Sequence, residues 1–185
     1  WRKKARRRCA WLMTKDKISV EVFAPAKINL CLHVTGQRAD GYHLLDTFVA
    51  FADIGDRVTL SNAGPSDICV TGPEAVPELS SIDNIMYFTA SQFWVPDIRL
   101  SMTLEKNLPL ASGIGGGSAD AAATYRGILW LRAAVEGRDE TRNPTAADAR
   151  LLMKIGADVP MCVLSDPARV RGIGEQIEPV PDMHP

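Results

Sequence analysis

Alternation of apolar and polar residues predicts β-strands in the first third of the chain. The alternation covers residues 18–22, resumes over residues 26–34 after a proline, and returns over residues 47–60. Successive side chains of a strand point to opposite faces, so Lys27 and Asn29 should lie side by side, off the core face. The other face of that strand is expected to hold four aliphatic side chains: Ile28, Leu30, Leu32 and Val34.

Helices are expected in the second half of the chain. The clearest covers residues 118–135, because Ser118 is a good N-cap and a run of small alanines follows it. A second helix is expected over residues 146–155, capped by Thr145 and ended by a glycine. A third is expected over residues 83–93, ahead of a proline.

Turns and short strands are expected between these elements. Residues 38–41 and 53–56 have the composition of turns. The other short elements expected are a strand over residues 98–104, an apolar run over 68–70, a buried strand over 161–164 and a turn over 170–174.

The glycine-rich stretch between the expected strand 98–104 and the helix 118–135 is the most informative part of the chain. Residues 109–118 read PLASGIGGGS. Glycines allow a backbone to approach a ligand closely, and a helix N-terminus offers free N–H groups and a positive dipole end. Together these features favour a phosphate site over the alternative of a flexible loop without a ligand. Walker A and dinucleotide loops are excluded, because Ser118 stands where their lysine or last glycine would be.

The pattern P-x-x-S-G-x-G-G-G-S resembles the phosphate loop of the GHMP kinases, a superfamily of ATP-dependent small-molecule kinases. Three more motifs resemble the family in the same order: PAKINL at residues 25–30, RADGYH at 38–43 and GADVP at 156–160. The D-G-Y-H motif is similar to the branch that phosphorylates a cytidine-diphosphate-linked methylerythritol in non-mevalonate isoprenoid synthesis. The resemblance implies an α+β fold, a GHMP-kinase N-terminal domain with a mixed sheet, helices and a ribosomal-protein-like βαβ core.

The resemblance also implies roles for five side chains. Asp158 would accept the proton of the substrate hydroxyl, and Lys27 would keep Asp158 ionised and counter the phosphoryl charge. Asn29 would orient the substrate, while Tyr42 would stack on a cytosine and His43 would bond to its edge. From the residues alone, plainer readings remain: a surface lysine, an aspartate that satisfies loop amides, and a Tyr-His turn packed on the core.

ATP and Mg²⁺ are the cofactors that the resemblance implies, with Mg²⁺ near Ser118. Asp120, which comes soon after it, would either assist there or be solvated on the helix surface. Residues 172–175 (GIGE) are expected to be a structural turn. The nucleotide-binding residues assigned in this way are Pro109, Leu110, Ala111, Ser112, Gly113, Ile114, Gly115, Gly116, Gly117, Ser118, Ala119, Asn84 and Lys106.

Composition sets the broad class of the protein. A chain of 185 residues with 46% hydrophobic residues suits one globular domain. No apolar run approaches the roughly 18 residues that span a bilayer. The four cysteines and three histidines are scattered, so a zinc site is not indicated and buried, reduced thiols in the cytoplasm are expected. Neither nucleic acid nor a membrane is expected as a partner, and the oligomeric state stays open.

The basic residues are concentrated at the start of the chain. Six of residues 2–8 are Lys or Arg, so a net charge of −1 leaves about −7 for the remainder. Residues 1–13 are expected to be a disordered tail, residues 14–181 the kinase N-terminal domain, and residues 182–185 a truncated end. The family's C-terminal domain is expected to be largely absent, which leaves the substrate half of the cleft incomplete. Two alternatives follow: another GHMP kinase, of homoserine or mevalonate type, or a catalytically inactive ATP-binding fragment.

Overall fold

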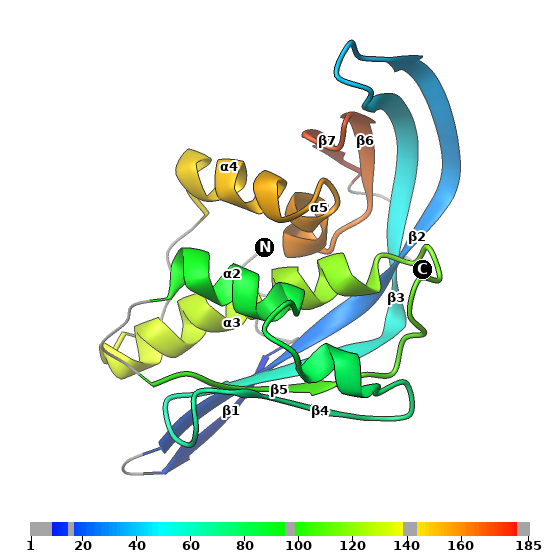
Figure 1. The fold of residues 1–185 in the computed structure, drawn as a ribbon. Helices are drawn as coiled ribbons and strands as arrows, with labels where there is room; N and C mark the ends of the chain where they lie inside the picture. Colours follow the sequence, from blue (N-terminus) through cyan, green and yellow to red (C-terminus); the bar gives the residue numbers. More distant parts are fainter. Residues whose placement is uncertain (1–8, 15–16, 95–98, 139–143, 181–185) are drawn as a thin grey trace.

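A seven-stranded mixed sheet is the framework of the molecule, and the helices gather on one side of it (Figure 1). The computed structural model describes residues 9–14, 17–94, 99–138 and 144–180. The strands are β1 (Cys9–Thr14), β2 (Lys17–Gln37), β3 (His43–Ser61), β4 (Ile68–Thr71), β5 (Ser101–Glu105), β6 (Ala168–Gly172) and β7 (Gln176–Pro179). The helices are the 3-10 helix η1 (Pro77–Ser80), α2 (Ile85–Phe93), α3 (Gly116–Val135), α4 (Ala146–Ile155) and α5 (Val159–Leu164).

Strand β3 is the centre of the sheet. Strand β2 pairs with it along most of its length, and on its other side β6 pairs with its first half and β5 with its second half. Strand β1 continues the sheet beyond β2, β4 lies beside β5, and β7 lies beside β6. Among the described strands only the β4–β5 pair is parallel. The mixed sheet and the helices agree with the expected α+β fold.

Helix α3 packs between the sheet and the other helices, and most of its side chains from Ala119 to Leu131 are buried. Its alanines are small enough to let the helix backbone approach the sheet. Because the sheet and the other helices cover most of α3, the helix has almost no polar face. Helix α4 is amphipathic and begins at a capping box, in which Thr145 accepts from the backbone of Asp148 and Asp148 accepts from Thr145. The three helices expected from the sequence are therefore present.

The expected turn at residues 53–56 is wrong, because β3 runs through it without interruption. The pairing register changes there, from Lys27 opposite Phe51 to Pro25 opposite Gly55, so the extra residues of β3 form a bulge. Glycine is required at position 55, since a Cβ there would lie 2.2 Å from the carbonyl oxygen of Ala24. Turn-forming residues bend the strand here but do not end it.

A second bulge changes the faces of β2. The register passes from Asn29 opposite Val49 to Cys31 opposite Phe48, so one residue of β2 has no partner in between. Leu32 is then opposite Thr47, whose hydroxyl accepts a hydrogen bond from Asn29. Paired residues point to the same side, so Leu32 shares the face of Asn29. The four aliphatic residues therefore do not share one face, and all four are exposed by 38–60%. Lys27, which was expected off the core face, is instead buried.

Two predictions near the C-terminal end are wrong as well. Residues 161–164 belong to helix α5 and not to a strand, and residues 168–172 form strand β6 where a turn was expected from residue 170. A short apolar run does not distinguish helix from strand by its period. Pro160 lies in the first turn of α5, where its missing N–H costs nothing. The turn itself falls between β6 and β7, as expected for residues 172–175.

The N-terminal boundary and the thiols also differ from expectation. Residues 1–8 and 181–185 lie outside the described residues, but residues 9–13, placed in the disordered tail, belong to strand β1. Of the cysteines that the structure describes, Cys162 is buried as expected, whereas Cys31 and Cys69 are exposed.

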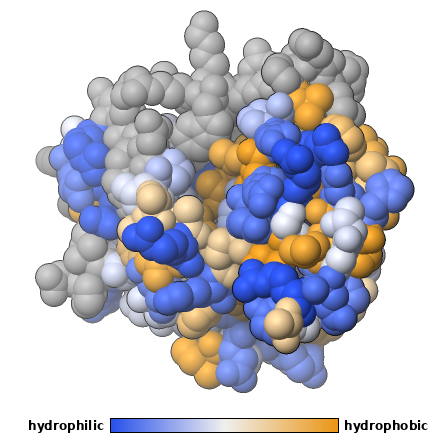
Figure 2. Space-filling model, turned by 90° about the horizontal axis from the view of Figure 1, so that it is seen from above, coloured by the Kyte–Doolittle hydropathy of each residue, from blue (hydrophilic) through white to orange (hydrophobic). Residues whose placement is uncertain are grey.

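No helix in the described part of the chain is both long and apolar enough to cross a bilayer. Figure 2 shows that one face of the molecule carries apolar patches separated by hydrophilic groups.

Candidate active site

The glycine-rich loop connects β5 to the N-terminus of α3, as expected for a phosphate loop. Helix α3 begins at Gly116, two residues earlier than expected, and its N-cap is Gly115 rather than Ser118. Gly115 has a φ of 69°, in the left-handed region that favours glycine. Residues 109–113 are exposed, and Ser118 lies half-buried in the first turn of the helix. The loop therefore presents a helix N-terminus near the surface, which is a suitable arrangement for an anion.

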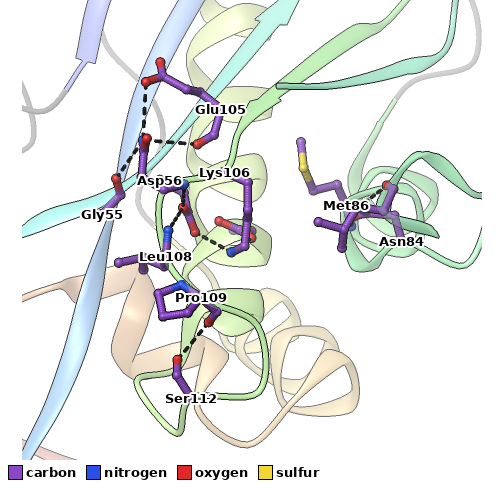
Figure 3. Close-up of polar contacts among 12 residues, drawn as sticks. Gly55, Asp56, Asn84, Met86, Glu105, Lys106, Leu108, Pro109 and Ser112 are labelled. Carbon is purple, nitrogen blue, oxygen red and sulfur yellow. Dashed lines mark hydrogen bonds and ion pairs between the residues drawn. The ribbon is translucent and has the colours of Figure 1, made fainter. Parts of the chain in front are cut away.

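The loop is fixed to strand β2 at Lys27. The backbone N–H of Lys27 donates to the carbonyl oxygen of Ile114 at 2.9 Å. The side chain of Lys27 packs along Gly115, where an added Cβ would come within 3.2 Å of its Cε. Within the loop, the hydroxyl of Ser112 donates to the carbonyl oxygen of Pro109 at 2.8 Å (Figure 3). The side chain of Lys27 therefore runs along the backbone of the glycine-rich loop.

Lys27 and Asp158 form the ion pair that the resemblance implies. The Nζ atom of Lys27 lies 2.7 Å from Oδ2 of Asp158. The lysine side chain is only 7% exposed, whereas the aspartate side chain is 37% exposed. Asp158 immediately precedes α5 and makes no capping hydrogen bond with its side chain. One partner is therefore held in the protein and the other remains accessible to a substrate.

The buried Arg126 of helix α3 connects the elements that carry this pair. Its guanidinium donates to the carbonyl oxygens of Cys162 and Val163 in α5, and to the hydroxyl of Ser165. The same group donates to the carbonyl oxygen of Phe23 in β2 at 2.7 Å. Lys27 follows Phe23 on that strand, and Asp158 precedes α5. The sequence analysis did not single out Arg126, although a charge inside an alanine-rich, apolar helix is a usable signal of a buried role.

Asn29 lies two residues beyond Lys27 on β2 and is half-buried. Its amide donates to the hydroxyl of Thr47, which in turn donates to the carbonyl oxygen of Cys31. Tyr42 and His43 are exposed at the far end of the β2–β3 hairpin, where His43 is opposite Gln37. That end lies eight residues along β2 from Asn29, with two register shifts in between. Any ligand common to all three residues must extend along the hairpin.

Two residues expected in the nucleotide pocket have other roles. Asn84 is buried and caps helix α2, accepting from the backbone of Met86 and donating to the carbonyl oxygen of Leu79 (Figure 3). Lys106 is 2% exposed, and its ammonium pairs with two buried carboxylates, Asp56 and Asp120. Both side chains are committed within the protein, so the geometry does not support direct nucleotide contacts by them.

The buried cluster around Lys106 changes how its members ionise. Burial raises the pKa of Asp120 to about 8, and the neighbouring Asp56 acts in the same direction, against the attraction of Lys106. Burial acts to lower the pKa of Lys106, but its two carboxylate partners outweigh that effect and raise it. Asp120 is not solvated on the helix surface, and it does not assist at an open site. Sequence reasoning missed Asp56, because it was assigned to a turn.

Among the described residues, no group of three or more His, Cys, Asp or Glu side chains forms a metal site. The hydroxyl of Ser118 lies near the segment that carries Asp158, 3.8 Å from where a Cβ on Gly156 would be. A Mg²⁺ ion held here would need phosphate oxygens and water for most of its ligands. Such ligation is usual for this ion in kinases.

Comparison with known proteins identifies the class first. Residues 82–166 match the family model described as the GHMP kinases N terminal domain. A crystal structure of mevalonate kinase from Staphylococcus aureus shares this fold, with a TM-score of 0.52 at 15% identity over 89% of this chain and 55% of that one. The chain has the fold of a GHMP-kinase N-terminal domain, which confirms the fold expected from the sequence.

Sequence identity to individual proteins then indicates which members of this class the chain resembles. It is 47% identical to the 4-diphosphocytidyl-2-C-methyl-D-erythritol kinase of Ruegeria pomeroyi over 90% of this chain and 56% of that protein. It is 51% identical to the enzyme of the same name from Roseobacter denitrificans, over 87% and 52%. A crystal structure of 4-(cytidine 5'-diphospho)-2C-methyl-D-erythritol kinase matches with a TM-score of 0.62 at 31% identity, over 86% and 55%. The chain spans about half the length of the curated relatives it matches.

Proposed function

We propose that this chain supplies the ATP-binding part and the catalytic pair of an ATP-dependent small-molecule kinase. The proposed reaction phosphorylates the 2-hydroxyl of 4-diphosphocytidyl-2-C-methyl-D-erythritol, in non-mevalonate isoprenoid biosynthesis. The observation that carries the proposal is the 2.7 Å ion pair between Lys27 and Asp158, placed directly beside the glycine-rich loop. The proposed substrate is the one named by the similar kinases.

Asp158 is the proposed acceptor of the hydroxyl proton. Phosphoryl transfer depends mainly on positioning and on charge stabilisation, with one group that orients or deprotonates the nucleophile. The ammonium of Lys27 lies against this carboxylate and would oppose the negative charge that develops on the transferred phosphoryl group. Because Asp158 is partly exposed and Lys27 is not, the substrate would approach from the side of the aspartate.

The phosphates of ATP are proposed to lie on residues 109–119, against the N-terminus of α3. The free N–H groups of its first turn and the positive end of its dipole attract negative charge there. Ser118 would bind a phosphate oxygen and hold Mg²⁺, which would shield the charge of the β- and γ-phosphates when bound. This arrangement needs no carboxylate cluster, in agreement with the chemistry of the described residues.

The proposed substrate site follows β2 away from the catalytic pair. Asn29, kept in place by Thr47, would orient the methylerythritol part, and the exposed Tyr42 and His43 would contact the cytosine. A nucleoside diphosphate linked to a sugar alcohol is an extended molecule with an aromatic end. It suits residues spread along one strand better than the compact substrates of homoserine or mevalonate kinases would. The proposed location of this metabolic enzyme is the cytoplasm.

The decisive experiment measures substrate-dependent release of ADP by the 185-residue chain with ATP and Mg²⁺. Substrates are 4-diphosphocytidyl-2-C-methyl-D-erythritol, homoserine and mevalonate, and the variant is Asp158→Asn. Asp67→Asn is the control, because Asp67 is exposed and precedes β4, away from the loop. Turnover with the cytidine substrate, lost in Asp158→Asn and kept in Asp67→Asn, supports the proposal. Turnover with another substrate contradicts it, and ATP binding without turnover favours a non-catalytic nucleotide-binding role.

A further inference from the structure

A buried ionic cluster of Asp56, Lys106 and Asp120 lies behind the glycine-rich loop (Figure 3). The Nζ atom of Lys106 donates to Oδ2 of Asp56 at 2.5 Å and to Oδ2 of Asp120 at 3.0 Å. The three residues are 0%, 2% and 3% exposed. Charges this deeply buried are costly unless they are paired, and nothing in the proposed chemistry uses them directly. The cost of burying these three residues therefore points to a role other than direct participation in the reaction.

The cluster joins three elements that meet at the loop. Asp56 belongs to β3, Lys106 follows β5, and Asp120 lies in the first turns of α3. These elements are far apart in the sequence, since 50 positions separate Asp56 from Lys106. A single ammonium therefore connects the central strand of the sheet to the helix that would bind phosphate.

The entrance of the loop is held by the second oxygen of Asp56. Its Oδ1 accepts from the backbone N–H of Asn107 at 2.6 Å and from that of Leu108 at 2.8 Å. These residues directly precede Pro109, the first residue of the loop. A carboxylate that accepts two backbone N–H groups fixes both peptide planes, and hydrogen bonds to a charged acceptor are strong.

The exit of the loop is held by Asp120 and by close packing at Gly116. A Cβ on Gly116 would lie 3.2 Å from Nζ of Lys106 and 3.9 Å from Oδ2 of Asp56. The first residue of α3 therefore rests directly on the ion pair. Lys106 then binds Asp120 one turn further along the same helix. The two ends of the loop are attached to one charged group.

We propose that Asp56, Lys106 and Asp120 are positioning residues that fix both ends of the phosphate loop before the nucleotide binds. The free N–H groups at the start of α3 then need no reordering, and preorganisation of this kind increases affinity without a new contact. The identity of the ligand as ATP rests on the proposed function. The alternative is that the cluster only stabilises the fold, and a stability-matched variant distinguishes the two.

The test compares three variants of the full chain. Asp120→Ala removes the link between Lys106 and α3 but leaves the neutral Asp56–Lys106 pair. Asp120→Asn keeps an oxygen for Lys106, and its amide replaces Oδ1, a buried oxygen with no hydrogen bond in the described structure. Leu131→Ala is the stability control, because Leu131 is fully buried in α3 about 22 Å from Gly116. Asp120→Ser, whose hydroxyl is too short to reach Lys106, replaces the alanine variant if that one does not fold.

Two readouts are needed: calorimetric titration with Mg²⁺ and ATP, and amide hydrogen exchange of residues 107–120 without nucleotide. We expect Asp120→Ala to bind ATP about tenfold or more weakly, with faster exchange in the first turn of α3. Asp120→Asn should stay within about threefold of the parent chain, and Leu131→Ala should change neither readout in this segment. Equal weakening in Asp120→Ala and Leu131→Ala would overturn the proposal, as would unchanged binding in Asp120→Ala.

Failure of the proposed function gives a different result. If the parent chain does not bind ATP at all, the assignment of the nucleotide is wrong, but the exchange measurement still decides the role of the cluster. Faster exchange at the start of α3 in Asp120→Ala, and not in Leu131→Ala, would then support positioning of the loop. Identical exchange in the two variants would show that the cluster only contributes to overall stability.

Discussion

Two lysines lie beside the glycine-rich loop, and they differ in how exposed their aspartate partners are. The difference distinguishes a proposed catalytic role from a structural one. Lys27 and Lys106 are both nearly inaccessible, and both pair with aspartate. Among the described residues, Lys27 forms an ion pair with Asp158, whose side chain is 37% exposed, whereas the side chains of the two partners of Lys106 are 0% and 5% exposed. A pair with one open partner can meet a substrate. A pair closed on both sides can only hold other parts of the protein.

The largest effect is expected from breaking the closed cluster. Lys106→Met leaves the buried carboxylate of Asp56 without its counter-charge, and loss of one member of a buried ion pair costs about 3–5 kcal/mol. The free energy of unfolding in urea should fall by that amount, measured by circular dichroism. A loss below about 1 kcal/mol would mean that water reaches the cluster.

Breaking the open pair should affect catalysis more than stability. Lys27→Met removes the charge that supports Asp158, and we expect kcat to fall by about 10²-fold, the usual scale for one group that stabilises developing charge. The unfolding free energy should change by about 1 kcal/mol at most, because the partner is already solvated. The prediction requires a substrate-active parent protein. A large loss of stability with unchanged kcat would reverse the contrast between the two lysines.

The difference in pH-dependent stability between the parent chain and Asp120→Asn should report the closed cluster. The raised pKa of Asp120, about 8, means that the folded chain keeps a proton that the unfolded chain releases above about pH 4. Unfolding free energy should therefore fall as pH rises from about 4 to 8, by at most about 1.4 kcal/mol per pH unit, and the dependence should end above the folded pKa. Asp120→Asn removes this contribution. The profile of the parent minus that of the variant isolates it, and a flat difference would contradict the raised pKa.

The smallest effect is expected from an exposed pair that belongs to neither group. Arg57 and Glu21 lie 2.8 Å apart across β2 and β3, with side chains 48% and 40% exposed. Surface pairs of this kind contribute little, so Glu21→Gln should change unfolding free energy by about 0.5 kcal/mol or less. Measured in the same urea series, Glu21→Gln should show the smallest change in unfolding free energy among these variants. A loss comparable to that of Lys106→Met would show that exposure is not the deciding variable.

The sequence singled out the residues at the front of the candidate site, which the structure brings together, and missed most of those behind the loop. The glycine loop, Lys27 and Asp158 were found from motifs whose letters carry their chemistry. Asp56 and Asp120 could not be found in this way, because their role depends on a contact across 50 residues and on burial, neither of which a local pattern records. Lys106 and Asn84 were placed in the pocket by motif position, while the structure directs them inward.

The same limit explains the errors in the fold. Period and caps predicted the three longer helices and parts of the two long strands, because these patterns repeat over many residues; both strands run on where a proline or a turn was expected to interrupt them. The bulge at Asn29 and the strand through residues 53–56 depend on the partner strand, so the register that decides them lies elsewhere in the chain. Helix α5 was too short for its period to be distinguished from that of a strand.

The unpaired residue between Asn29 and Cys31 shifts the phase of the residues that follow it in β2, as far as the next register shift after Val34. Before the bulge, one face of the hairpin carries the ammonium of Lys27 and the amide of Asn29. After the bulge, Leu32 lies on that same face. The result is a surface that changes from hydrophilic to apolar along a single strand. Lineages that carry this hairpin should therefore tolerate exchanges of Leu30 more readily than its deletion, because deletion would restore the alternation and invert the distal face.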